Sequence, residues 1–311
     1  MAAKRFVFVV MLLALAGCAG LTEIQNGLSQ FDQGAHSVST AQMGFFHQVQ
    51  VADCNNQFYG NAYDFATGKG DKLNLAANCS PTLLTTKQIE TRQKLMDSLT
   101  LYADKLQALG TNDDNKTLDT NSQDLAKNLN SFAKDKSVSK IGLKVADGVE
   151  AAIVAIAEMA LDQRRYADIK KAASAMQPHI LKITESLKQE NTVFAEGLGS
   201  KVDQIQIQLR SALLASRTSQ KERSFLDVLA AREIVRSTNP LGASPISAPS
   251  DSDDPKLDPR NVAKQMNASL DALANANDAL ATAGTGGFIA AVSDLVARGK
   301  HANDLFTSLN K

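Results

Sequence analysis

Tryptophan is absent from this 311-residue chain, and aromatic side chains make up only 5% of it. Because large rings are scarce, we expect thin, alanine-rich cores between closely packed helices. Proline is also rare, and five of the seven prolines lie between residues 237 and 261. The rest of the chain therefore has few helix breakers, and no alternating strand pattern competes with helix.

Motifs for catalysis and metal binding are missing as well. The four histidines form no His-x-x-x-His pair, and no Gly-x-Ser-x-Gly or phosphate-binding glycine loop occurs. His36 and His47 share a helix face but lie about 16 Å apart along it, which is too far for one ion. An acidic spacing after Asp113 resembles a calcium loop, but Leu118 stands where that loop needs glycine. We predict no catalytic residues, no metal ligands and no cofactor.

Charge of either sign is not in excess, since 33 basic and 33 acidic side chains balance. Basic blocks such as Arg164-Arg165 and Lys170-Lys171 are short and interrupted by acids, as on a solvated helix face. A nucleic-acid partner would need a basic surface to neutralise phosphates, so the composition argues against one.

The most informative segment is N-terminal. Lys4-Arg5 precede an apolar run from Phe6 to Leu15, and small residues follow, which is the pattern of a secretory signal. The run from Phe6 to Gly17 has 12 residues, against about 20 needed to span a bilayer. Leu15-Ala16-Gly17-Cys18 resembles the lipobox of bacterial lipoproteins. The resemblance implies cleavage before Cys18 and a covalent lipid on that residue.

The residue after the lipobox cysteine bears on location. In lipoproteins of Gram-negative bacteria, Asp at that position favours retention in the inner membrane. The residue here is Ala19, so the resemblance favours the outer membrane over the inner membrane, and we expect the anchored chain to face the periplasm. The lipid would be the only group carried by the protein, and the membrane its first partner.

Two further cysteines, Cys54 and Cys79, form an even pair in a chain predicted to be exported. Because the periplasm is oxidising, we predict a disulfide between them. Closing that loop would contribute roughly 3 kcal/mol in the chain-entropy description.

Helical periodicity dominates the mature chain. Alternating three- and four-residue steps predict a helix over residues 21–52, with a polar residue, Gln42, in one core position. Its apolar or small positions are Ile24, Leu28, Phe31, Ala35, Val38, Phe45, Val49 and Ala52. Further helices are predicted from Ser80-Pro81 to Gly110 and from residue 180 to Gly199, with a break or kink at Pro178.

Between Cys54 and Cys79 the helical pattern fails, and Asn and Gly predict a structured loop over residues 55–78. Four aromatic side chains inside it are candidates for binding a partner: Phe58, Tyr59, Tyr63 and Phe65. The favoured alternative is that these rings pack the loop onto the bundle.

The most apolar part of the mature chain lies at residues 141–161, and its segment 148–161 has two interpretations. A buried central helix is the favoured interpretation. The alternative is a membrane-active bundle, because long helical pore-forming toxins resemble this chain in architecture. In those toxins such a segment inserts into lipid.

The sequence therefore predicts an all-α protein: an elongated multi-helix bundle with coiled-coil-like antiparallel packing, one disulfide-closed loop and a C-terminal helical hairpin. The predicted parts are a signal (1–17), a bundle (18–236) with the loop 54–79, a Pro/Ser/Asp-rich linker (237–261) and the hairpin (262–311). We expect a non-enzymatic envelope scaffold, adaptor or binding lipoprotein with an envelope protein as partner. An envelope hydrolase is the less favoured alternative.

Overall fold

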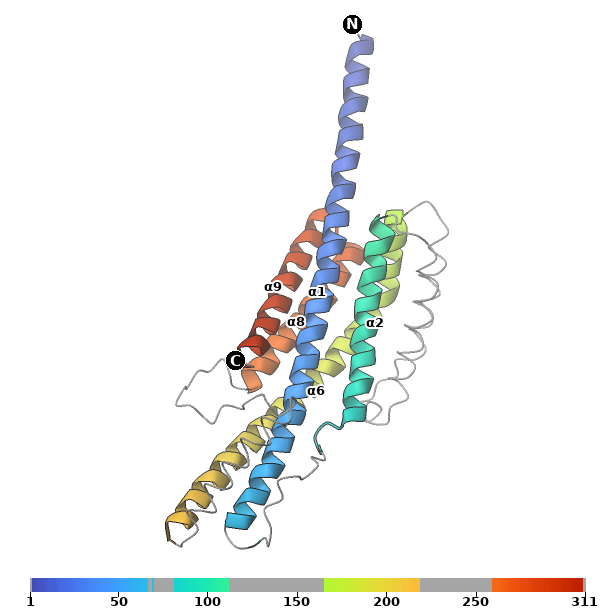
Figure 1. The fold of residues 1–311 in the computed structure, drawn as a ribbon. Coiled ribbons are helices and arrows are strands. Elements are labelled where there is room, and N and C mark those ends of the chain that lie inside the picture. The colour runs from blue at the N-terminus through green and yellow to red at the C-terminus, as the bar shows by residue number, and fades with distance from the viewer. Residues whose placement is uncertain (1, 67–68, 70–80, 112–164, 219–258, 310–311) are drawn as a thin grey trace. The chain divides into compact units, whose positions relative to one another are not determined.

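The structure is a computed structural model that describes residues 2–66, 69, 81–111, 165–218 and 259–309. Within these residues it contains five helices and no strand, so the all-α prediction is confirmed there (Figure 1). The helices are α1 (Ala2–Ala66), α2 (Thr86–Thr111), α6 (Arg165–Thr218), α8 (Pro259–Thr282) and α9 (Thr285–Leu309). The apolar segment 148–161 and the linker residues 237–258 lie outside the described residues.

The chain divides into two compact units, which we describe separately. Unit 1 comprises Met1–Thr40, Thr91–Lys188 and Asn267–Asn303. Unit 2 comprises Ala41–Glu90, Gln189–Met266 and Asp304–Lys311. Among the described helices, none has a stretch that is both long and apolar enough to cross a bilayer.

The predicted core stripe of α1 is confirmed. Every member is buried, and Gln42, the polar residue predicted in one core position, is completely enclosed. The helix continues beyond the predicted end at residue 52 and runs to Ala66. The prediction that residues 55–66 belong to a loop is therefore wrong. Extending an existing helix adds one hydrogen bond per residue, so the Asn and Gly residues lower helix propensity without stopping it.

The start of α2 also differs from the prediction. We expected the helix to begin at Ser80-Pro81, but it begins at Thr86. Thr85 and Gln88 form a capping box: the Gln88 side chain accepts from Thr85 N at 2.8 Å, and Thr85 Oγ1 accepts from Gln88 N at 3.4 Å. This reciprocal pair satisfies two backbone donors that a helix start leaves open, which fixes the first turn.

Helix α6 is one element from Arg165 to Thr218, so Pro178 does not end it. A proline inside a helix removes one backbone hydrogen bond and costs about 3 kcal/mol or more. Pro178 is exposed, whereas Ile180, Ile183 and Leu187 are buried. Packing of the opposite face therefore holds the helix together on the C-terminal side of the proline.

Two C-terminal helices are present, as predicted. Helix α8 begins at Pro259, three residues before the predicted start of the hairpin at residue 262, and α9 begins three residues after α8 ends. Gly286 and Gly287 belong to the first turn of α9. Both helices bury a row of apolar or small side chains: Val262, Met266, Leu270, Leu273 and Leu280 on α8, and Phe288, Val292, Leu295 and Ala302 on α9.

In unit 1, glycines bring α1 close to α9. A Cβ atom on Gly27 would lie 2.7 Å from Cε1 of Phe288, and one on Gly34 would lie 2.5 Å from Cγ of Leu295. The two glycines are seven residues apart, as are their partners, so the register is constant and these segments run parallel. Real side chains do not approach so closely, and only glycine fits at both positions.

The neighbouring helix pair in unit 1 runs the other way. The Phe31 ring of α1 meets the Tyr102 ring of α2 edge-on at 6.3 Å, while Leu28, nearer the start of α1, lies beside Gly110, nearer the end of α2. Helices α1 and α2 are therefore antiparallel here, as predicted for the bundle. The coiled-coil-like geometry stays a prediction.

A buried polar network joins three helices of unit 1. The Tyr102 hydroxyl on α2 donates to Asn277 Oδ1 on α8 at 2.5 Å. The Asn277 amide in turn donates to the carbonyl of Ala173 at 3.0 Å and to Gln177 Oε1 at 2.7 Å, both on α6. Burial raises the pKa of Tyr102 far above its usual range, so the hydroxyl stays protonated and keeps donating.

Candidate functional site

The predicted lipid-bearing cysteine, Cys18, belongs to α1, and so does the rest of the lipobox, which begins at Leu15. Its side chain is outside the part of the chain that the structure describes. Lipidation of Cys18 therefore stays a prediction from sequence.

The structure describes one of the two predicted disulfide partners. Cys54 lies on α1 and is partly exposed, whereas Cys79 lies outside the described residues. The residue before Cys54 is informative: Asp53 is completely buried and accepts hydrogen bonds from the backbone N–H groups of Thr82 and Leu83, the latter at 2.9 Å. The Thr82 hydroxyl also donates to this carboxylate at 2.9 Å. Asp53 thus fixes the chain just after Cys79 to the helix position just before Cys54.

The four candidate partner-binding aromatics stand in a helical backbone rather than in a loop. Phe58 is half-buried in α1. The side chains of Tyr59, Tyr63 and Phe65 lie outside the described residues. Both the binding role and the packing role of these rings stay predictions.

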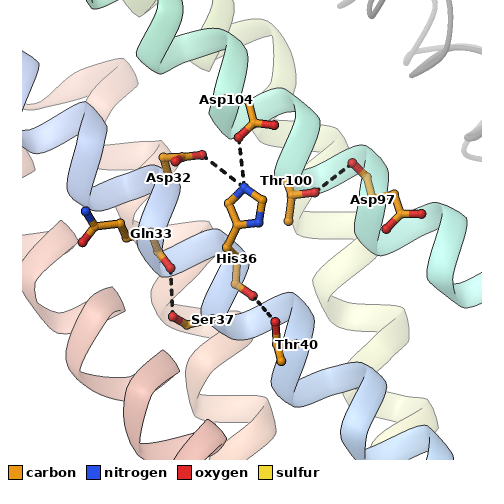
Figure 2. Close-up of polar contacts among 8 residues, drawn as sticks. All are labelled: Asp32, Gln33, His36, Ser37, Thr40, Asp97, Thr100 and Asp104. Carbon is orange, nitrogen blue, oxygen red and sulfur yellow. Dashed lines mark hydrogen bonds and ion pairs between the residues drawn. The ribbon is translucent and has the colours of Figure 1, made fainter.

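The structure also brings together three side chains that the sequence analysis did not combine. Asp32 and His36 project from α1 towards Asp104 on α2, as Figure 2 shows. His36 Nε2 lies 2.9 Å from Asp104 Oδ1 and 3.6 Å from Asp32 Oδ1. One donor atom from each residue lies within 4.8 Å of the other two. We call these residues the Asp-His-Asp cluster.

Local helix geometry explains the cluster. Asp32 and His36 are four residues apart, so both side chains lie on one face of α1. That face meets α2, where Asp104 lies one turn or less from the buried Tyr102 and Leu106. The Phe31–Tyr102 contact next to it fixes the spacing of the two helices.

The electrostatics of the cluster are unusual for surface residues. The pKa of Asp32 is raised from 3.8 to about 6, first by burial and then by the hydrogen bond and negative charge of Asp104, while His36 opposes the shift. The Asp32 side chain is 16% exposed, against 52% for His36 and 46% for Asp104. The cluster therefore has one enclosed carboxylate and two groups that solvent reaches.

Part of this cluster was readable in the sequence. Asp32-x-x-x-His36 places two metal-ligand types on one helix face, and a search for paired histidines alone misses it. Asp104 lies 68 residues further along the chain, on another helix, and no local spacing connects it to His36. An imidazole nitrogen and two carboxylates can hold a proton between them or bind a divalent ion.

Comparisons with known proteins give no relative from which a role could be transferred. No family model, no curated protein and no solved structure matches the chain.

Proposed function

We propose that this chain is a non-enzymatic, lipid-anchored helical scaffold or adaptor of the bacterial cell envelope. It is held at the periplasmic face of the outer membrane through a lipid on Cys18 and presents its helices to an envelope protein. The proposal combines the lipobox from Leu15 to Cys18 with the helical architecture of the described residues.

The observation that carries the proposal is the continuity of α1. This helix of 65 residues contains both the lipobox and the buried stripe that begins at Ile24. Ile24 follows Cys18 by six residues, or about 9 Å along a helix. A lipid on Cys18 would therefore tether the core of unit 1 with no intervening loop. Such a short tether suits a protein whose position relative to the membrane matters.

The anchor is tested by metabolic labelling with a palmitate analogue in cells that express the full chain. We expect wild type and the matched variant Cys54→Ser to carry the label in the membrane fraction. Cys18→Ser is expected to be unlabelled and unprocessed. Label that persists in Cys18→Ser, or its absence from wild type, would overturn the lipid anchor.

We also propose that Cys54 and Cys79 are joined by a disulfide. Thr82, which Asp53 binds, follows Cys79 by only three residues, and three extended residues reach about 11 Å at most. The hydrogen bonds at Asp53 hold Thr82 beside the helix position that precedes Cys54, which supports the proposed pairing. Peptide mapping of the unreduced full chain should recover the linked pair, and recovery of both free thiols from the periplasm would contradict it.

The partner is sought with a photo-crosslinking residue at two positions in living cells. We call residues 58–65 of α1, which contain the four candidate aromatics, the aromatic segment. Asn61 is exposed in this segment, and Val193 is exposed on α6, where 64% of the residue is accessible. We expect a discrete adduct with one envelope protein that disappears in the Cys18→Ser background. An adduct from Asn61 alone assigns binding to the aromatic segment, and an adduct from Val193 alone assigns it to the α6 face. The scaffold role would be refuted if neither position crosslinked.

A further inference from the structure

The Asp-His-Asp cluster has the donor set of a metal site. It offers one imidazole nitrogen and at least one oxygen from each of two carboxylates. Mixed nitrogen and oxygen ligands suit divalent transition metals such as Zn²⁺, whereas Ca²⁺ and Mg²⁺ prefer oxygen alone. The chemistry therefore favours a transition-metal ion.

The two separations between His36 Nε2 and the carboxylate oxygens agree with that choice. Ligand atoms about 2.0–2.1 Å from a tetrahedral zinc ion lie about 3.3 Å from one another. His36 Nε2 is 2.9 Å from the Asp104 oxygen and 3.6 Å from the Asp32 oxygen, on either side of that value. Shifts of a few tenths of an ångström, within the freedom of partly exposed side chains, would bring both separations to it.

A second observation points to a ligand at the same place. Asp32 Oδ1 is buried, and within the described residues it has no hydrogen-bond partner, because its neighbour His36 Nε2 lies 3.6 Å away, beyond hydrogen-bond distance. Buried polar atoms are normally satisfied, because an unpaired one costs free energy of desolvation. This oxygen lies 3.6 Å from His36 Nε2, so an ion bound between the three residues would satisfy it. The exposed sides of His36 and Asp104 leave a path for entry.

We propose that Asp32, His36 and Asp104 form a three-ligand site for a divalent transition-metal ion, with Zn²⁺ as the best fit. A fourth position, open to water, completes the tetrahedron. Because two ligands come from α1 and one from α2, the ion ties these helices together. The site is additional to the proposed scaffold role and does not depend on the lipid anchor.

The test uses the full chain, stripped with EDTA and titrated with ZnCl₂ in a calorimeter. We expect one Zn²⁺ per chain in this site and a rise in melting temperature on binding. Loss of even an outer-sphere partner weakens metal binding about 10–100-fold. His36→Gln and Asp104→Asn, which each remove a direct ligand, should therefore weaken it at least as much.

Matched controls are available on the same helices. Asp97 is an exposed carboxylate on α2, one heptad before Asp104, and its variant Asp97→Asn should bind Zn²⁺ like wild type. His47→Gln removes another exposed histidine of α1 and should also leave binding unchanged. Melting curves without metal show whether each variant is folded.

Substitution of Co²⁺ for Zn²⁺ adds a readout that a structural defect does not mimic. Tetrahedral Co²⁺ with a nitrogen ligand gives visible absorption bands, which should be lost in His36→Gln while that variant remains folded. Equal binding by wild type and His36→Gln, or an equal loss in Asp97→Asn, would overturn the site. No binding by the folded wild-type chain would overturn it as well.

Discussion

Helix α1 packs by different means in the two units. In unit 1 its glycines let α9 approach, and Gly34 lies directly against the buried Leu295. In unit 2 the same helix uses buried polar groups, since Gln42 exchanges two hydrogen bonds with Asn191 of α6, and Asp53 binds the segment before α2. Close approach of helices depends on the absence of side-chain atoms, whereas polar pairing depends on two particular side chains. We therefore expect unit 1 to lose stability when a contact glycine is replaced by a larger residue. We expect unit 2 to lose stability when a buried polar side chain is replaced by one that cannot form its hydrogen bonds.

The largest effect is expected at the amide pair of unit 2. Gln42 and Asn191 are both completely buried, and their amides bind each other at 2.5 and 3.0 Å. Gln42→Leu keeps the volume but leaves the Asn191 amide without these two bonds, so we expect a loss of about 3–4 kcal/mol in the free energy of unfolding. Urea unfolding of the full chain measures it.

The matching control for that prediction is the double variant Gln42→Leu/Asn191→Leu. Replacing both partners removes the unsatisfied groups, so the double variant should be more stable than the sum of the single losses. Simple additivity would show that the two amides act independently, and the contrast between the units would then fail.

The second prediction concerns the Asp53 carboxylate. Asp53→Ala removes a buried acceptor that binds the N–H groups of Thr82 and Leu83 as well as the Thr82 hydroxyl. Thr82 is exposed, so water can replace part of what is lost. We expect a destabilisation of about 3 kcal/mol, measured by urea unfolding. Asp64→Ala, an exposed carboxylate further along α1, is the control and should change stability by less than about 0.5 kcal/mol.

A third prediction addresses the glycine contacts of unit 1. Alanine has a higher helix propensity than glycine by about 1 kcal/mol, so Gly→Ala normally stabilises a helix. At Gly34 the new methyl group would overlap Cγ of the buried Leu295, and overpacking costs about 1–3 kcal/mol. After the gain in helix propensity is subtracted, we expect Gly34→Ala to lower the free energy of unfolding by about 1 kcal/mol, measured by thermal unfolding of the full chain.

Gly286 supplies the control for this third prediction. It lies in the first turn of α9, and a methyl group there would meet no atom within 4 Å. Gly286→Ala should therefore leave stability unchanged or raise it slightly. If both substitutions stabilise the protein, α1 and α9 are not in the close contact described here.

These particular residues show how far the sequence leads. The stripe from Ile24 to Ala52, including the polar position of Gln42, was predictable because one helix face repeats every three to four residues. The end of α1 at Ala66 was not, because Asn and Gly weaken a helix without determining where it ends. The start of α2 was missed, although Thr85-x-x-Gln88 is a readable capping box.

Long-range partners limit the prediction of sites in the same way. Asp32-x-x-x-His36 is visible in one helix turn, but Asp104 enters only through the antiparallel pairing of α1 with α2. Likewise, nothing near Gly34 in the sequence shows that Leu295 lies against it. The sequence therefore predicts which face of a helix is buried, whereas the identity of the neighbour depends on the tertiary structure.

The smallest expected effect is a pH dependence of the folding stability, caused by Asp32, in the metal-free protein. The folded-state pKa of about 6 lies above the ordinary 3.8, so between these values the folded chain binds more protons than the unfolded chain. Burial and the neighbouring Asp104 carboxylate raise the pKa of Asp32, and His36, the other group that faces it, lowers that pKa. The contribution of Asp32 to stability is full below about pH 4 and is lost as the pH rises through 6. Because the cluster is partly exposed, we expect a change of less than about 1 kcal/mol.

Urea unfolding in EDTA at pH 4.5 and pH 7.5 isolates this contribution when wild type is compared with Asp32→Asn. The amide does not titrate, so the difference in stability between the two proteins should move in favour of Asp32→Asn at the higher pH. Asp97→Asn, on the exposed side of α2, should follow wild type at both values. A constant difference between wild type and Asp32→Asn would mean that Asp32 is as well solvated as a surface carboxylate. In that case the Asp32 carboxylate would make no pH-dependent contribution to the stability of unit 1. Unit 1 would then differ from unit 2 through its glycine contacts alone.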